Sequence, residues 1–203
     1  MNLIQRTEWY FYKKLKKIRL KNKDFSIISS NCNGSFIYHD MGLRFLTPTI
    51  NLSFEMNDFV KFLSDIHLYL NQDIIECGDD RFDYPTGMIG DVEIRFNHFQ
   101  TFDEAKKKWN ERKQRINWNN LFIFAIDGDD CTYDSMQRFD KLPYKNKVIF
   151  THKPYPEIKS SFYIKGFEND DGVGALIDFK EQYWIRRFLD DFDYISFLNN
   201  NRS

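Results

Sequence analysis

The sequence lacks several features that would assign it to a common functional class. Its net charge is −1, so no overall positive field attracts nucleic acid, and we expect no nucleic-acid partner. Its three cysteines form no CxxC pair, which argues against a zinc cage or a thioredoxin-like site. It has no glycine-rich phosphate loop, and no apolar run approaches the roughly 18 residues of a membrane span. We therefore predict neither a metal nor a cofactor.

What is present is enough to form a sizeable core. The chain has 203 residues, of which 42% are hydrophobic and 21 are phenylalanine. That length and composition predict one globular domain, residues 1–203, and argue against disorder. Unpaired, widely spaced cysteines fit a reducing compartment, and the first residues do not resemble a signal peptide. We expect a cytoplasmic protein.

Strand-like and helix-like segments alternate along the chain. The predicted strands are residues 25–30, 91–98, 120–127, 147–152 and 161–167. The predicted helices are residues 3–20, 35–43, a helix starting at 57, the segment 101–117, a short helix around Met136 and Phe139, and 178–189. Such alternation predicts an α/β fold, a layered single domain whose largely parallel or mixed central sheet is flanked by helices. The polar segment 195–203 is predicted to be a frayed tail.

The N-terminal segment 3–20 is both amphipathic and basic. It carries apolar residues at helical spacing, and its second half is rich in lysine. One interpretation is a helix that contacts an anionic membrane surface, which would place the protein at the inner face of the membrane. The other is a packed helix with a solvated lysine face. The sequence leaves both open.

Two strand ends carry side chains suited to catalysis. The first predicted strand of the pair ends at His98, and the second ends at Asp127. In open α/β sheets, ligands bind in the crevice at the carboxyl ends of the strands. The helix between them begins with a predicted capping box at Thr101, and it carries Arg112 and Arg115 near its end. These two arginines could bind a phosphate or a carboxylate.

Cys32 is the candidate nucleophile. It lies between a buried strand and the start of a helix, where backbone N–H groups lower the pKa of a thiol. His98 would then be its base and Asp127 the carboxylate that orients the histidine. Asn31, or a backbone N–H near Gly34, would stabilise an oxyanion. The alternative is that Cys32 is an inert core residue, because free cysteines are commonly buried.

Several blocks of the sequence resemble a known bacterial family. They occur in the family's order between about Asp24 and Thr151: ISSNCNGSFIYHDMGLRFLTPTINL, YPTGMIGDVEIRFNHF, EAKKKWNERKQRIN, NLFIFAID and NKVIFT. The chain resembles domain-of-unknown-function family 1919, whose members are usually labelled exopolysaccharide biosynthesis proteins. The resemblance implies a bacterial cytoplasmic protein linked to surface-glycan synthesis. One departure is Asn33, because the family often has an aromatic residue after the cysteine.

A looser likeness is to putative papain-like cysteine peptidases of bacteria. Those proteins show a similar serine-asparagine-cysteine start and a later histidine ahead of an arginine-rich helix. The likeness implies Cys32 as nucleophile, His98 as base and Asp127 as the orienting group.

Three functions remain open at this point. The first is acyl transfer or hydrolysis through Cys32 and His98. The second is a sugar transferase that uses a nucleotide-sugar or lipid-linked donor, with Arg112 and Arg115 on the diphosphate and Asp127 or Asp129 as base. The third is a non-catalytic component of the polysaccharide machinery. A sugar-phosphate or lipid-linked glycan is the expected substrate, and the sequence does not decide whether turnover occurs.

Overall fold

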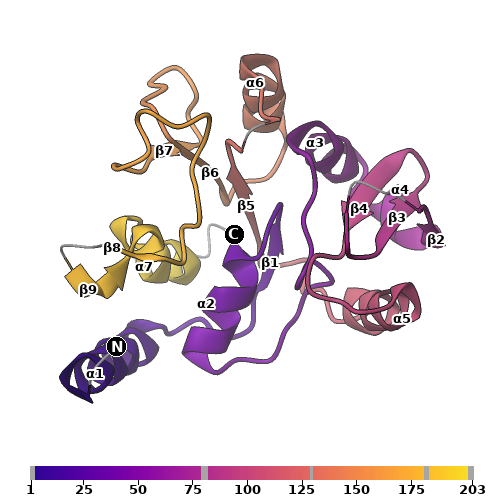
Figure 1. The fold of residues 1–203 in the computed structure, drawn as a ribbon. Helices are drawn as coiled ribbons and strands as arrows, with labels where there is room; N and C mark the ends of the chain where they lie inside the picture. The colour runs from indigo at the N-terminus through magenta and orange to yellow at the C-terminus, as the bar shows by residue number, and fades with distance from the viewer. Residues whose placement is uncertain (1–2, 79–81, 129, 181–182, 201–203) are drawn as a thin grey trace.

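A parallel four-stranded sheet forms the centre of the molecule. The computed structural model describes residues 3–78, 82–128, 130–180 and 183–200. In this sheet the strand order is β1 (Ser26–Ser29), β5 (Leu121–Ile126), β6 (Lys147–Thr151) and β7 (Ser161–Tyr163), and all neighbours are parallel. Parallel strands need crossover connections, and the helices between them provide these (Figure 1). The predicted α/β fold class is confirmed.

Both faces of this sheet are buried, because alternate side chains of each strand point into different cores. On β5, Phe122 and Phe124 belong to one core, whereas Ile123 and Ala125 belong to the other. The first core is covered by α2 (Asn33–Met41) and α7 (Tyr194–Asn199). The second is covered by α3 (Met56–Ser64) and α6 (Tyr133–Lys141). This two-sided burial explains why the strands are nearly continuous apolar runs.

A smaller antiparallel sheet packs beside α3. Its strands are β2 (Ile75–Glu76), β3 (Thr86–Ile89) and β4 (Val92–Arg95), in that order. The remaining elements are α4 (Ile66–Asn71), α5 (Phe102–Lys113), the hairpin β8 (Phe179–Lys180) and β9 (Tyr183–Arg187), the 3-10 helix η1 (Phe188–Asp191), and α1 (Leu3–Arg19). Figure 1 shows α1 at the edge of the molecule beside β9.

Three expectations from the sequence need correction. The strand expected to end at His98 is β4, which ends at Arg95 and lies in the antiparallel sheet rather than the central one. The helix expected over 178–189 is wrong, since the backbone there forms β8, β9 and η1. The tail expected to fray from 195 is helical to Asn199, where Ile195 and Leu198 are buried.

None of the described helices is both long enough and apolar enough to cross a bilayer.

Candidate functional site

The carboxyl ends of β1 and β5 form the most distinctive junction of the fold. The chain leaves β1 into α2 on one face of the sheet, whereas α6, which follows β5, packs on the other face. Where connections from adjacent strands diverge in this way, a crevice opens between them and commonly binds ligands. The residues that follow β1 are Ser30, Asn31 and Cys32.

Cys32 is held at this junction by the backbone around it. The Ser30 amide donates to Phe124 O on β5 (2.9 Å), which extends the β1–β5 pairing by one residue. Cys32 then occupies the N-cap position of α2 with a helical backbone conformation. Its sulfur lies 3.9 Å from the carbonyl oxygen of Leu52. The thiol therefore sits at the N-terminus of a helix, against the segment 51–54.

The segment 51–54 connects the Cys32 region to the end of β4. The Phe54 amide donates to Ser30 O (2.9 Å), and Ser53 exchanges two backbone hydrogen bonds with Arg95 (2.8 and 2.9 Å). The Ser53 hydroxyl also donates to the side-chain oxygen of Asn97 (2.8 Å). His98 comes next in the chain, so these bonds bring it to the side of the crevice that Cys32 occupies.

A tight turn presents the exposed His98 side chain. The Phe99 amide donates to Phe96 O (3.0 Å), and the two phenylalanine rings are buried with their centroids 5.9 Å apart. Because both flanking rings are anchored in the core, the residue at the tip of the turn is directed outward.

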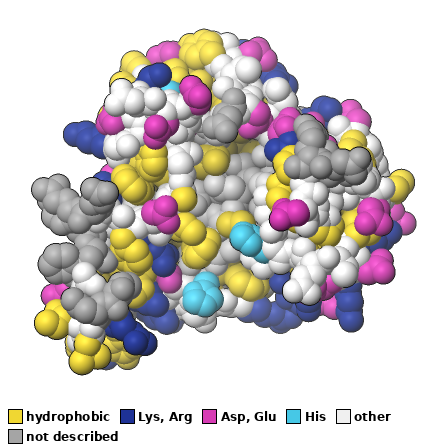
Figure 2. Space-filling view, viewed as in Figure 1, with side chains coloured by type: hydrophobic (Ala, Val, Ile, Leu, Met, Phe, Trp, Pro, Cys, Tyr) yellow, Lys and Arg dark blue, Asp and Glu magenta, His cyan; other side chains and the backbone are white. Residues whose placement is uncertain are grey.

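Cys32 and His98 line the same two adjoining cavities. One has a volume of about 210 Å³, the other about 420 Å³, and both share Cys32, Phe36 and His98. The smaller is closed on one side by Ala175, Leu176 and Ile177, and the larger extends to His39, Phe45 and Asn51. We call this joint space the Cys32 cleft. Figure 2 shows that this face of the molecule is hollowed near its centre, with histidine side chains beside the hollow.

Two residues that line the Cys32 cleft have buried side-chain polar groups without hydrogen bonds to other described residues. The side-chain nitrogen of Asn33 and the hydroxyl of Ser35 are buried and have no hydrogen-bond partner within the described part of the chain. Asn33 lines the smaller cavity and Ser35 the larger. An unpaired buried polar group costs roughly 1–3 kcal/mol. Unpaired buried atoms also occur away from the cleft, for example Trp109 Nε1 and Ser160 Oγ, so these two do not by themselves indicate a ligand.

The side-chain oxygen of Asn31 accepts hydrogen bonds, whereas its side-chain nitrogen points in another direction. Its Oδ1 accepts from the Asn33 amide (3.0 Å) and from the Ser29 hydroxyl (3.4 Å). These bonds fix the amide plane, so the Nδ2 group points away from them. Asn31 also lines the smaller cavity together with Cys32 and His98. The structure thus places the predicted oxyanion donor next to the predicted nucleophile.

Backbone strain accompanies the cleft. Asn51, which lines the larger cavity, has a φ of 62°, the one non-glycine residue of the described ranges with a positive φ. Asparagine tolerates this left-handed conformation better than most residues, but it still costs energy. The conformation turns the chain so that Leu52 O faces the Cys32 sulfur.

Burial reverses one expectation about Cys32. The helix N-terminus was expected to lower the pKa of the thiol, but burial raises that pKa above its ordinary value. The main cause is desolvation, which disfavours the charged thiolate. A nucleophilic role for Cys32 would therefore require an adjacent base.

Among the described residues, the histidine that Asp127 contacts is His152 and not His98. Only 3% of Asp127 is exposed, and its Oδ2 accepts from the His152 amide (2.8 Å) and lies 2.6 Å from His152 Nδ1. Its Oδ1 accepts from the Val173 amide (2.9 Å). Both oxygens are therefore occupied, and burial raises the pKa of this carboxyl. The expected role of Asp127 is corrected: it joins the ends of β5 and β6 to the loop at 172–173.

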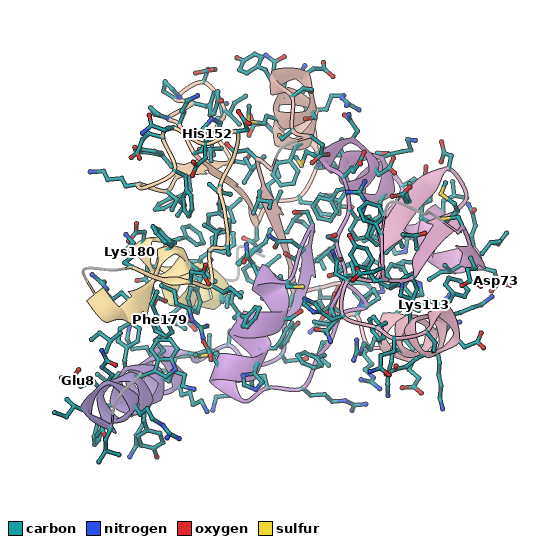
Figure 3. The ribbon with its side chains drawn as sticks, viewed as in Figure 1. Glu8, Asp73, Lys113, His152, Phe179 and Lys180 are labelled. Carbon is teal, nitrogen blue, oxygen red and sulfur yellow. The ribbon has the colours of Figure 1, made fainter. Side chains whose placement is uncertain are left out.

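Sequence reasoning did not identify His152 as the partner of Asp127. Figure 3 labels it in the part of the molecule around β6 and β7, and it does not line the Cys32 cleft. Gly172 lies against the backbone of Asp127. A Cβ atom at Gly172 would come within 2.1 Å of Asp127 O. The loop thus packs tightly on Asp127, and it continues into Ala175–Ile177, the wall of the cleft.

The predicted anion-binding residues take up different positions. Arg112 Nη1 lies 3.5 Å from Ile50 O, and its guanidinium stacks over Phe45 at 5.4 Å, on the outer side of the cleft wall. Arg115 lies 3.9 Å from Glu111. Neither arginine lines the Cys32 cleft. Gly34 packs against β1, where a Cβ atom would meet Ile27 Cγ2 at 3.0 Å, so this glycine lets α2 approach the sheet.

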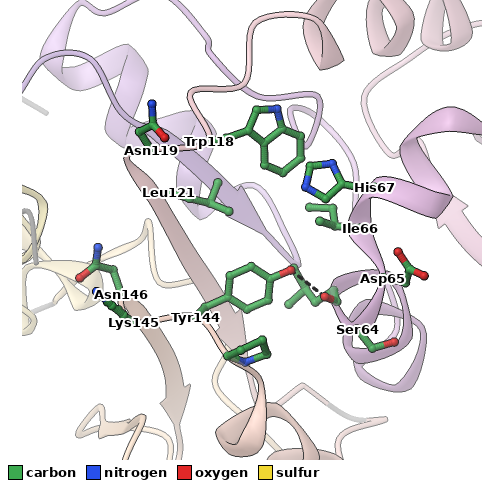
Figure 4. Close-up of a pocket in the computed structure, with 12 residues that line it drawn as sticks. Ser64, Asp65, Ile66, His67, Trp118, Asn119, Leu121, Tyr144, Lys145 and Asn146 are labelled. Carbon is green, nitrogen blue, oxygen red and sulfur yellow. Dashed lines mark hydrogen bonds between the residues drawn. The ribbon is translucent and has the colours of Figure 1, made fainter. Parts of the chain in front are cut away.

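A larger cavity lies at the opposite end of the sheet. It has a volume of about 690 Å³ and lies between α4 and the chain segments that lead into β5 and β6 (Figure 4). His67 packs on Trp118 with ring centroids 4.2 Å apart, and the Tyr144 hydroxyl donates to Leu63 O (2.6 Å). Burial raises the pKa of Tyr144 to about 12. No cysteine lines this cavity, so the candidate nucleophile belongs to the Cys32 cleft.

Within the ranges that the structure describes, no group of three or more His, Cys, Asp or Glu side chains is arranged to hold a metal ion. Asp129, the alternative base of the predicted sugar transferase, lies outside the described residues.

Comparison with known proteins adds family membership. A family model described as a domain of unknown function, DUF1919, matches residues 3–199. The chain belongs to this family. The DUF1919 match spans α1 and every residue that lines the Cys32 cleft. An uncharacterised protein of Haemophilus influenzae strain Rd is 39% identical over 198 residues, which cover 97% of this chain and 95% of that protein. The resemblance to this DUF family is confirmed.

Proposed function

We propose that this DUF1919 protein catalyses acyl transfer or acyl hydrolysis, with Cys32 as nucleophile and His98 as general base. The observation that carries the proposal is that both residues line the same two cavities at the carboxyl end of the central sheet. A cysteine that is not ionised on its own is activated by an adjacent base, and an imidazole is the usual one.

The chemistry proceeds in two balanced steps. First, His98 accepts the thiol proton while Cys32 Sγ attacks the carbonyl carbon of an acyl donor. The tetrahedral intermediate then collapses, the leaving group departs with the proton from His98, and a thioester remains on Cys32. In the second step, water or an acceptor hydroxyl attacks the thioester. Its proton passes through His98 to the sulfur, which restores the thiol and releases the acyl product.

The surroundings of Cys32 suit the intermediate of this reaction. Its oxyanion needs hydrogen-bond donors in a site from which water is largely excluded. The side-chain nitrogen of Asn31 and a backbone amide near Gly34 are the donors we assign, because the Asn33 amide already donates to Asn31 Oδ1. The positive end of the α2 dipole contributes in the same direction.

The lining of the cleft indicates the acyl group. Phe36, Leu176 and Ile177 form an apolar wall in the smaller cavity. A wall of this kind favours a short apolar acyl chain, while the larger cavity leaves space for the remainder of the donor or for the acceptor. We propose a sugar hydroxyl of a surface glycan as the acceptor. This is supported by the resemblance to proteins labelled as exopolysaccharide biosynthesis proteins.

The alternative of a nucleotide-sugar transferase has less support in the structure. Asp127 has both carboxylate oxygens engaged, and Arg112 and Arg115 lie outside the cleft. No described residue of the cleft supplies a cation for a diphosphate apart from a protonated histidine. We therefore place acyl chemistry first.

The test is turnover of p-nitrophenyl acetate and butyrate, together with intact-mass detection of an acyl adduct. We expect Cys32→Ala to abolish both, and His98→Ala to reduce turnover by about a hundredfold or more, because general-base assistance contributes that much. His67→Asn and Cys131→Ala, at residues that do not line the Cys32 cleft, are the controls and should keep native turnover. Circular dichroism verifies the fold of each variant. Equal turnover in native protein and Cys32→Ala would refute the proposal.

A further inference from the structure

The surface of α1 opposite the body of the protein carries a continuous apolar stripe. Ile4, Phe11, Leu15 and Ile18 are spaced by seven, four and three residues, which places them on one face of a helix. All are exposed, Phe11 by 56% and Leu15 by 61%. Soluble proteins rarely leave several large apolar side chains together in water, and such patches mark interaction surfaces.

The opposite face of α1 is firmly attached to the protein. Lys16 is buried, forms an ion pair with Asp190 and donates to the Tyr194 hydroxyl (3.0 Å). Trp9 packs edge-on against Phe179 with ring centroids 5.1 Å apart. Figure 3 shows Phe179 beside the helix that bears Glu8. The exposed stripe is therefore a fixed feature of the folded molecule and not the result of a detached helix.

The basic residues of α1 include some that pair with the body of the protein and others that face outward. Helix α1 has six basic residues and one acidic residue, although the whole chain has a net charge of −1. Lys13, Lys16 and Arg19 form ion pairs with acidic residues of the body. Lys14 and Lys17 are exposed, and neither has an ion-pair partner within the described ranges.

A basic depression lies at the end of the apolar stripe. It has a volume of about 350 Å³ and is lined by four lysines, namely Lys14, Lys17, Lys21 and Lys23, together with Ile18 and Leu20. Figure 2 shows hydrophobic and basic side chains gathered on the part of the molecule that contains α1. An apolar stripe bordered by lysines matches a bilayer surface, where acyl chains lie beneath anionic headgroups.

From this pattern, we infer that α1 docks on a membrane surface that contains anionic lipid. Phe11, Leu15 and Ile18 enter the boundary between headgroups and acyl chains, while Lys14 and Lys17 contact lipid phosphates. A second copy of the chain is a poorer occupant, because pairing two stripes would bring their flanking lysines together without a matching row of acidic residues. The surface does not involve the Cys32 cleft, so it stands independently of the proposed chemistry.

The experiment is co-sedimentation of the whole protein with vesicles. One set contains phosphatidylcholine alone, and the other contains equal amounts of phosphatidylcholine and phosphatidylglycerol. We expect binding to the anionic vesicles, and high salt should weaken it because screening acts on the lysine–phosphate attraction. The double variant Phe11→Ser/Leu15→Ser should bind at least about tenfold more weakly, since two large apolar side chains no longer enter the bilayer.

Matched variants separate the two components of the surface. Lys14→Gln/Lys17→Gln should weaken binding about tenfold or more, whereas Lys107→Gln/Lys141→Gln, with the same net charge, should not. Ile75→Ser removes an equally exposed apolar residue elsewhere and should bind like the native protein. The inference fails if no vesicle binding occurs, or if the controls lose as much binding as the α1 variants. It also fails if Phe11→Ser/Leu15→Ser converts a dimer to a monomer in sedimentation velocity while vesicles bind neither form.

Discussion

At the scale of single residues, burial and hydrogen bonding distinguish the accessible side chains among the three predicted catalytic residues from the enclosed one. Asp127 is buried and accepts hydrogen bonds on both carboxylate oxygens. Cys32 is partly accessible, and His98 is exposed in the same cleft. Of the three predicted catalytic residues, Cys32 and His98 are therefore the accessible ones, whereas the Asp127 carboxylate is engaged by His152 and Val173.

The first residue-scale prediction concerns the pH dependence of Cys32. Because burial raises the pKa of its thiol, the thiolate fraction at a given pH is smaller than in a free cysteine. Alkylation by iodoacetamide in a Cys77→Ser/Cys131→Ser/His98→Ala background, where no base assists the thiol, should therefore rise with a midpoint above about 8.5, the value of an ordinary thiol. Rates followed by mass spectrometry from neutral to alkaline pH provide the measurement. A midpoint below the ordinary value would contradict the described burial.

The second residue-scale prediction concerns Asp127. Replacing it by alanine leaves two backbone amides and the His152 ring without their acceptor. We expect Asp127→Ala to lower the free energy of unfolding by about 3 kcal/mol, the scale for breaking a buried pair. Urea denaturation measures the change. Asp170→Ala, an exposed aspartate in the neighbouring loop, should alter stability little, and equal losses in both variants would argue against the assigned role.

Three residues predicted from the sequence line one cavity of the structure, namely Asn31, Cys32 and His98. They could be singled out because strand ends and helix starts are visible in the pattern of residues. Their proximity was not predictable, since it depends on Ser53 pairing with Arg95 across a long sequence separation. His152 was missed because nothing in its local sequence shows that β6 lies next to β5. The sequence also did not single out Asn33, Ser35 or the segment 175–177 as lining the cleft, because only the folded chain brings them beside Cys32 and His98.

At the scale of helices and strands, apolar patterns predicted most elements but not all of them. The strands β1, β5 and β6 and the helices α1, α5 and α6 lie where the sequence predicts them. The segment 178–189 was predicted as a helix, because apolar residues at close spacing suit a helix or a strand equally well. Its hairpin form depends on pairing between Phe179 and Arg187, which local sequence does not reveal.

A prediction at this scale concerns the attachment of α1. Lys16→Ala removes the cation that pairs with the buried carboxylate of Asp190. We expect a loss of about 3 kcal/mol, because an unpaired buried charge remains. Chemical denaturation measures the loss, and limited proteolysis should show faster cleavage within α1. Lys17→Ala, at an exposed position one residue further on, is the matched control. Indistinguishable stability of the two variants would contradict this attachment.

At the scale of the whole molecule, the fold brings four distant segments to one cleft. Cys32 follows β1 of the central sheet, and the segment 51–54 connects it to β4. The turn after β4 carries His98, and the segment 175–177 closes one side of the cleft. On a separate surface, α1 presents apolar and basic side chains outward. If both proposals hold, the chain combines a cleft for acyl chemistry with a membrane-docking helix, as expected of an enzyme that acts on a membrane-associated substrate.

The most direct test of the account is the rate of Cys32 alkylation at pH 7 in the native protein and in His98→Ala. Both proteins carry Cys77→Ser and Cys131→Ser, so that only Cys32 reacts. The account predicts a rate at least about tenfold lower in His98→Ala, because the neutral thiol loses its base. At strongly alkaline pH, where the thiolate forms without assistance, the two rates should converge. Equal rates at pH 7 would contradict the pairing of Cys32 with His98.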